Sequence, residues 1–195
     1  MIFSSRESLM SSSISGSGDH QIRPHDPTWP RTAEELIRRV HLILGDTAVR
    51  VEHIGSTAVP ALAGRPIPDI QVSVVDIQAK ERFDRPLRDA GYIHFAFPEL
   101  AVDDYLVYVP ADGSNTEHIE VCEVDSFQER RHLAVRDYLR SHLDEALAYE
   151  AVKRQAAEMA GGRRELYSVG KNDFLHGLEQ RALLWYDSHD PSEAT

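Results

Sequence analysis

Cysteine and long apolar runs are scarce in this sequence. Cys122 is the only cysteine in 195 residues, so an intrachain disulfide is excluded and an oxidising compartment is not indicated. No stretch approaches the roughly 18 consecutive apolar residues that a membrane helix requires, and the N-terminus lacks the apolar run of a signal peptide. We therefore expect a cytoplasmic protein without a membrane partner, in which Cys122 is a small buried side chain.

Positive charge is also scarce. The 21 Lys and Arg residues are outnumbered by 32 Asp and Glu residues, which gives a formal net charge of −11. Binding to extended DNA or RNA needs clustered Lys and Arg against the phosphates, so a nucleic acid is not an expected partner. A local basic pocket for one phosphorylated small molecule is compatible with this charge. Nothing in the sequence fixes an oligomeric state.

The length and composition suit one folded domain. The hydrophobic fraction of 42% is close to the globular average. Residues 1–24 are rich in Ser and Gly and lack apolar periodicity, which predicts a disordered leader. Residues 25–187 are predicted to form the domain, and residues 188–195 a flexible tail.

The order of hydrophobic periodicities predicts an α+β domain. Trp29 is expected to pin an extended N-terminal segment onto the core, and a helix then starts at a capping-box spacing of Thr32 and Glu35. Strands are expected at residues 49–54, 69–75, 92–95, 105–109 and 117–123. Further helices are expected at residues 77–90 with a break at Pro86, from a second capping box at Ser126 and Glu129 onward, at 144–159, and at 172–186.

A Gly-Ser turn followed by an acidic strand is the most informative pattern. Gly55-Ser56 ends one predicted strand, and Asp69 begins the next with Gln71 on the same face. A Gly-Ser turn lets backbone N–H groups and a hydroxyl approach a phosphate, and a nearby carboxylate can hold Mg²⁺ against it. One face of a later predicted strand carries His118, Glu120 and Cys122.

Four segments resemble the GrpB-like family, and together they span roughly residues 25–187. They read VEHIGSTAVPALAGRPIPDI at 51–70, DPTWP at 26–30, RHLAVRDYLR at 131–140 and YSVGK at 167–171. The resemblance implies a nucleotidyltransferase-like mixed β-sheet flanked by helices, with a C-terminal helical extension. It also implies that some relatives carry a dephospho-CoA kinase domain on the same chain.

The motif and the resemblance together name the candidate site residues. Asp69 and Glu120 are the predicted catalytic carboxylates, and with His118 they are the predicted ligands of Mg²⁺ or Mn²⁺. The predicted nucleotide-binding residues are Gly55, Ser56, Thr57, Arg65, Tyr167 and Lys171. A solvated, charged helix face is expected for Arg130, Arg131, Arg136 and Arg140.

Two functions stay open, because Gln71 stands where an active nucleotidyltransferase has its second carboxylate. In the first, the protein is a metal-dependent nucleotidyltransferase acting on a nucleoside triphosphate and a small acceptor, and Glu120 supplies a carboxylate. In the second, the cleft binds a nucleotide or phosphorylated metabolite without turnover, and Glu120 is an ordinary polar residue. A further alternative joins His53 to His118, Asp69 and Glu120 in one Zn²⁺ or Mn²⁺ site, against an ordinary structural role for each histidine.

Overall fold

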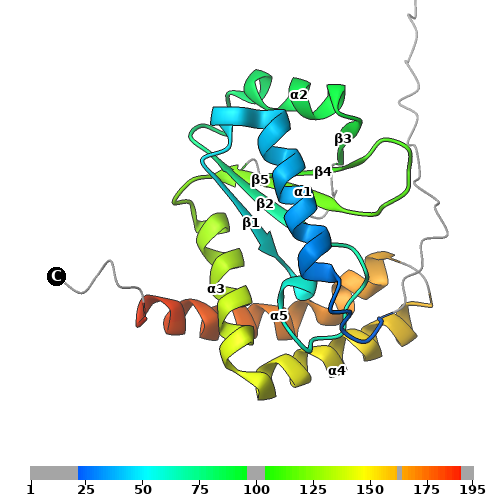
Figure 1. Cartoon of the computed structure of the whole chain (residues 1–195). Helices are drawn as coiled ribbons and strands as arrows, with labels where there is room; N and C mark the ends of the chain where they lie inside the picture. The colour runs from blue at the N-terminus through cyan, green and yellow to red at the C-terminus, as the bar shows by residue number, and fades with distance from the viewer. Residues whose placement is uncertain (1–21, 96–103, 162–163, 190–195) are drawn as a thin grey trace, which may run out of the picture.

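A mixed β-sheet lies at the centre of the computed structural model, which describes residues 22–95, 104–161 and 164–189 (Figure 1). In spatial order its strands are β1 (Arg50–Ile54), β2 (Asp69–Val74), β5 (His118–Glu123), β4 (Tyr105–Pro110) and β3 (Tyr92–Phe95). The β2 and β5 strands are parallel, and the other neighbours are antiparallel. The predicted α+β class and the mixed sheet are confirmed.

One face of the sheet is apolar and packs against α1 (Trp29–Leu44) and α2 (Asp84–Asp89). The α1 helix presents a buried stripe made by Ala33, Leu36, Val40 and Leu44. Alternate residues of the central strands meet this stripe, namely Ile70, Val72 and Val74 of β2 and Ile119 and Val121 of β5. The period-2 alternation of both strands therefore leaves their intervening side chains for the opposite face.

That opposite face is associated with the C-terminal helices α3 (Phe127–Ser141), α4 (Leu143–Ala160) and α5 (Arg164–Asp187). The α3 helix contacts β1 and β5, while α4 and α5 pack against each other. Figure 1 shows the three helices gathered at the end of the sheet where β1 terminates. Polar side chains of the sheet are thus enclosed between strands and helices. No helix among the described residues is long and apolar enough to cross a lipid bilayer.

The first helix begins earlier than its sequence pattern predicted. The helix starts at Trp29, which is buried but helical rather than extended, and Pro30 occupies the first turn. Thr32 lies inside the helix, so the predicted capping box is wrong. Asp26 supplies the local turn instead, because its Oδ1 accepts from the backbone N and the hydroxyl of Thr28 at 2.8 and 2.7 Å.

Two later helices also differ from the prediction, whereas the second predicted N-cap, Ser126, is confirmed. The backbone N–H of Glu129 donates to Ser126 Oγ at 3.2 Å. The predicted helix at 77–90 is divided into a 3-10 turn (Lys80–Arg82) and α2, and Pro86 sits in the first turn of α2 rather than at the break. The last helix begins at Arg164 instead of residue 172, which places Tyr167 and Lys171 one turn apart on one helix.

The predicted leader lies largely outside the described residues. Within them, Arg23 already pairs with Gly64, since each backbone N donates to the carbonyl of the other at 2.8 and 2.9 Å. Ordered packing therefore begins before the predicted boundary at residue 25. Of the predicted tail, Ser188 and His189 are exposed, and residues 190–195 lie outside the described part of the chain.

Candidate functional site

The register of the sheet brings together polar side chains of β2 and β5. Asp69 pairs with His118 and Gln71 with Glu120, and Ile54 at the end of β1 pairs with Asp69. Paired residues of neighbouring strands project from the same face. The predicted sharing of a face by Asp69 and Gln71, and by His118 and Glu120, is confirmed, and the pairing of β2 with β5 makes it one face.

Asp69, His118 and Glu120 form a cluster able to hold a metal ion. One ligand atom from each of the three lies within 4.8 Å of the others. His118 Nδ1 is 2.9 Å from Asp69 Oδ1, and its Nε2 is 3.0 Å from the side-chain oxygen of Asn115. An amide oxygen only accepts, so Nε2 carries a proton and Nδ1 is left to take a second proton or a cation. This is the arrangement by which an outer hydrogen bond orients a metal-ligating histidine.

The electrostatics of the two carboxylates also fit a divalent cation. Burial, reinforced by the charge of Asp69, raises the pKa of Glu120 to about 8. Burial also tends to raise the pKa of Asp69, but the hydrogen bond and charge of His118, followed by the charges of Arg65 and Lys171, hold it below its ordinary value. Two such carboxylates do not ionise together at neutral pH without a cation between them. Mg²⁺ or Mn²⁺ would therefore be suited to this cluster.

Replacing Asn115 is expected to weaken metal binding without removing a ligand. Asn115→Ala deletes the acceptor that fixes the orientation of His118, and loss of such an outer partner costs about 10- to 100-fold in metal affinity. Titration calorimetry with Mn²⁺ measures the change, and Ser114→Ala, next to it on the exposed turn, is the control. An unchanged Mn²⁺ affinity in Asn115→Ala would show that Asn115 does not orient a metal-ligating His118.

Lys153 of α4 is a buried cation that lines the same cavity as Asp69 and Glu120. Its side chain is 2% exposed, its Nζ donates to the carbonyl of Ala63, and it lies 4.9 Å from the ring centre of Tyr149. No carboxylate of the described residues lies within 4.0 Å of it. Burial, followed by the charge of Lys171, lowers the pKa of Lys153 to about 7. A buried ammonium in this setting is stabilised by an anionic ligand.

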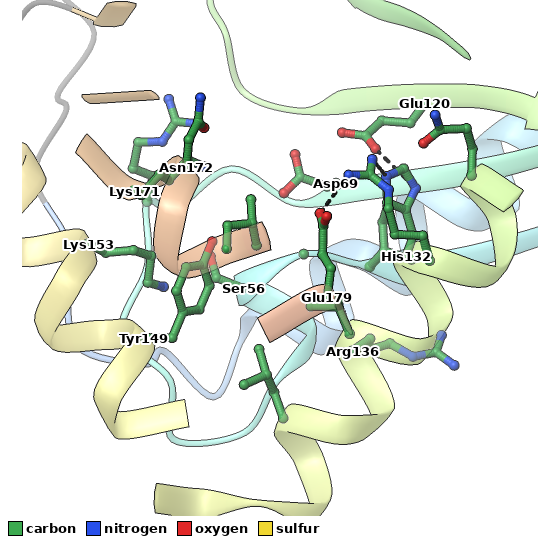
Figure 2. Close-up of a pocket in the computed structure, with 18 of the residues that line it drawn as sticks. Ser56, Asp69, Glu120, His132, Arg136, Tyr149, Lys153, Lys171, Asn172 and Glu179 are labelled. Carbon is green, nitrogen blue, oxygen red and sulfur yellow. Dashed lines mark hydrogen bonds and ion pairs between the residues drawn. The ribbon is translucent and has the colours of Figure 1, made fainter. Parts of the chain in front are cut away.

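Three cations, Arg65, Lys153 and Lys171, form what we call the cationic wall. Arg65 and Lys171 lie on Tyr167, at 5.7 and 5.2 Å from its ring centre. The structure thus brings the predicted residues Arg65, Tyr167 and Lys171 together. In Figure 2, Lys153 and Lys171 lie on one side of Asp69, whereas Glu120 and His132 lie on its other side. All of these residues line one cavity of about 470 Å³.

Two glycines near the cationic wall let neighbouring side chains approach the backbone closely. Gly55 has φ +71°, and a Cβ there would lie 2.3 Å from Asp69 Oδ2. A Cβ on Gly64 would lie 2.5 Å from Ser56 Oγ and 4.0 Å from Lys153 Nζ. Gly55 therefore accommodates the Asp69 carboxylate, and Gly64 leaves room for the side chains of Ser56 and Lys153.

Thr57 and His53 are not brought into the cavity. Thr57 is fully buried, and its Oγ1 is 2.8 Å from His53 Nε2. His53 pairs with Ile70, so it faces the apolar side of the sheet, and it is not a member of the metal-ligand cluster. The predicted contact of Thr57 with a nucleotide and the alternative metal site that includes His53 have no support in this geometry.

Gln71 is occupied by a neighbouring histidine. It is 0% exposed, and its Oε1 accepts from His132 Nδ1 at 2.8 Å. The other ring nitrogen of His132, Nε2, lies 2.8 Å from Arg131 Nη2, which donates to it. Burial and the charge of Arg131 lower the pKa of His132 to about 3, so its ring is neutral. Gln71 thus orients a neutral imidazole rather than extending toward the metal cluster.

The prediction of a solvated arginine face on α3 is wrong for two of its residues. Arg131 Nη1 is 2.6 Å from Glu179 Oε1, and Arg136, whose side chain is 11% exposed, has Nη1 2.7 Å from Glu52 Oε2. Arg136 also donates to the carbonyl of His53 at 3.2 Å, and Arg140 donates to that of Ala58 at 2.9 Å. These two bonds hold the turn that contains Gly55 and Ser56 at both ends.

Lys153, His132, Asn115 and Gly64 were not anticipated from the sequence. For Lys153 a signal was present, since it interrupts the buried stripe of α4 that is otherwise Ala146, Tyr149, Ala156 and Ala160. A lysine at such a position of an amphipathic helix is costly unless it has a partner. His132 and Asn115 had no local signal, because their partners are distant strand residues.

Fold and site together define an α+β domain whose sheet carries a candidate metal cluster opposite a cationic wall. The sequence model for the family described as GrpB protein matches residues 19–181, and the chain belongs to this family. The UPF0157 protein SCO7215 of Streptomyces coelicolor is 37% identical over 158 residues, which is 81% of each chain. The solved structure of conserved protein GrpB from Enterococcus faecalis has a TM-score of 0.76 and 30% identity, covering 85% of this chain and 99% of that one.

Some relatives are much longer. The UPF0157 protein YqkA of Bacillus subtilis is 29% identical over 161 residues, and the match spans 83% of this chain but 46% of that protein. The chain therefore spans about half the length of this relative.

Proposed function

We propose that the cavity binds a nucleoside triphosphate together with Mg²⁺ or Mn²⁺ and transfers its nucleotidyl group to a small acceptor. The observation that carries the proposal is the separation of charge across one cavity. Asp69, His118 and Glu120 offer ligands to a cation, and Asp69 and Glu120 line the same cavity as the cationic wall. A metal-bound polyphosphate is complementary to both sides at once.

The residues divide the work of binding. Asp69, His118 and Glu120 would hold the metal, which supplies neutralisation of the charge that develops on the reacting phosphoryl group. Arg65, Lys153 and Lys171 bind the phosphates, and Ser56, which lines the same cavity, adds a hydroxyl. The net charge of −11 favours a small acceptor over a nucleic acid.

In the proposed reaction, the acceptor hydroxyl oxygen attacks the α-phosphorus of the triphosphate. A bond forms between that oxygen and the α-phosphorus, while the bond from the α-phosphorus to the bridging oxygen breaks. Pyrophosphate leaves with the electron pair of the broken bond, and the hydroxyl proton passes to a carboxylate of the site, Asp69 or Glu120, and then to solvent. The cationic wall stabilises the charge of the leaving pyrophosphate.

A binding module without turnover is the second candidate, and Gln71 favours it. Asp69 supplies the only carboxylate of β2, because position 71 carries a glutamine. The side-chain oxygen of Gln71 accepts a hydrogen bond from His132. Release of pyrophosphate by the wild-type protein separates the two functions. A mixture of the four common nucleoside triphosphates with Mn²⁺ is expected to yield pyrophosphate above the protein-free rate if the protein is an enzyme.

The experiment that tests binding itself is titration calorimetry of ATP with and without Mn²⁺. ATP and Mn²⁺ are each expected to bind more tightly in the presence of the other. Mn²⁺ reduces the repulsion between ATP and the carboxylates of the metal cluster, and ATP reduces the repulsion between Mn²⁺ and the cationic wall. If none of the common triphosphates binds in the presence of either metal, the transferase function is wrong, and a binding module is left only with a phosphorylated metabolite other than these nucleotides.

The affinity for ATP in metal-free buffer is expected to fall as the pH rises. An anion binds the protonated form of Lys153, whose pKa in the free protein is lowered by burial and by Lys171 to about 7. Above that pH, Lys153 must take up a proton when ATP binds, so the affinity for ATP falls by up to about tenfold per pH unit. Calorimetry in EDTA between about pH 7.5 and 9.5, where the phosphates of ATP stay ionised, measures the slope. A flat profile would contradict a role for Lys153.

A further inference from the structure

The cavity has a second part, which we call the acceptor lobe, made by Tyr105, Val107, Gln128, Arg131 and His132. It adjoins the metal cluster through Glu120, which pairs with Val107 in the sheet and has Oε2 3.7 Å from His132 Nδ1. Tyr105 closes the lobe, with its ring centre 5.6 Å from that of His132. In Figure 2, His132 and Glu120 lie away from Lys153 and Lys171. The lobe is therefore separate from the cationic wall.

The charges of the lobe disfavour an anion. Besides the cationic wall, the cations that line the described part of the cavity are Arg131 and Arg136. Both are held by carboxylates, Arg131 by Glu179 at 2.6 Å and Arg136 by Glu52 at 2.7 Å. Glu120 adds a further carboxyl group. A carboxylate or phosphate in this lobe would have to compete with Glu179 for Arg131 and would lie beside the carboxyl group of Glu120.

The hydrogen-bonding groups of the lobe are complementary to a ligand that both donates and accepts hydrogen bonds. Gln128 Oε1 and Arg131 Nε belong to residues that line the lobe, and both atoms are buried without a hydrogen-bond partner among the described residues. One unpaired acceptor and one unpaired donor at one end of a cavity are costly unless a ligand completes them. Adjacent hydroxyl groups do so, since each hydroxyl both donates and accepts.

We propose that the acceptor lobe binds an uncharged or cationic polyhydroxylated small molecule, of the sugar, amino sugar or polyol class, and that Gln128 determines this specificity. The proposal deepens the proposed function, on which it rests, because such a molecule supplies the hydroxyl that receives the nucleotidyl group. Its binding is measured without any transfer reaction, so the two proposals fail separately.

The test uses glucose, glucosamine and glucuronate, which share a pyranose ring and differ in charge. In saturation-transfer NMR with the wild-type protein and Mg²⁺, glucose and glucosamine are expected to give signals and glucuronate is not. Gln128→Leu is expected to weaken glucosamine binding about tenfold, the loss of roughly one hydrogen bond. Gln155→Leu, the same change at an exposed position of α4, is the matched control.

Glucuronate signals as strong as those of glucose overturn the proposal, as does a glucosamine affinity that Gln128→Leu leaves unchanged, or the absence of signal from all three sugars. If Gln128→Leu does not fold, Gln128→Asn withdraws the same amide by one methylene and replaces it in the test. Calorimetry of ATP with Mn²⁺ on the same samples reports on the triphosphate site. Loss of ATP binding there with retained glucosamine binding would refute the proposed function and leave the sugar site standing.

Discussion

Asp69→Asn is expected to reduce Mn²⁺ affinity by about 100-fold or more and to abolish pyrophosphate release. The carboxylate of Asp69 is the only one of the site whose pKa lies below its ordinary value, so it supplies the charge that a cation meets first at neutral pH. Removal of one outer partner already costs about 10- to 100-fold, and loss of a charged ligand is expected to cost at least the upper value. Calorimetry with Mn²⁺ and a pyrophosphate assay measure the two effects.

The apo stability of Asp69→Asn is expected to fall modestly. Asp69 has a partner in His118 at 2.9 Å, so neutralising it removes a charge-assisted hydrogen bond, worth about 1.5–3 kcal/mol. Because the pKa of Asp69 in the folded protein is depressed, this contribution is present at neutral pH and is lost as the pH falls through that pKa. Asp46→Asn, on an exposed turn, is the matched control. If Asp69→Asn folds and binds Mn²⁺ like the wild type, the metal site is wrong.

Lys153→Met is expected to weaken ATP binding and to make the ligand-free protein more stable. A hydrogen bond to a charged group contributes about 1.5–3 kcal/mol, so the affinity for ATP with Mn²⁺ should fall by about 10- to 100-fold. The apo protein gains because a buried ammonium without a carboxylate partner is replaced by an apolar side chain of similar length. A melting temperature higher by a few degrees is expected.

The stability gain of Lys153→Met should depend on pH in a defined direction. The pKa of Lys153 is about 7 in the folded protein against an ordinary value of 10.5, so the unfolded chain holds more protons between these values. The stability of the wild type therefore rises with pH across this window, and the advantage of the variant is largest below pH 7 and shrinks toward 10.5. Lys80→Met, at an exposed position, is the control. Lower stability of Lys153→Met together with unchanged ATP affinity would make Lys153 a structural residue.

The C-terminal helices show where sequence patterns were insufficient. The start of α5 at Arg164 was missed because no apolar stripe marks its first turns, and it was this helix that brought Tyr167 and Lys171 next to Arg65. The arginines of α3 carried the charge pattern of a solvated face. Their partners Glu179 and Glu52 belong to α5 and β1, and such distant pairs leave no trace in local periodicity.

The sequence by itself determined which side chains share a face of a strand and where the Gly-Ser turn lies. Side-chain direction along a strand follows from backbone geometry, so Asp69 and Gln71, like His118 and Glu120, were assigned correctly by alternation. Only the tertiary structure decided that β5 lies parallel to β2. That pairing sets His118 against Asp69, and packing of α4 brings Lys153 into the cavity that Asp69 lines. Neighbours of this kind are selected by burial and hydrogen bonding across the whole chain, which no local pattern encodes.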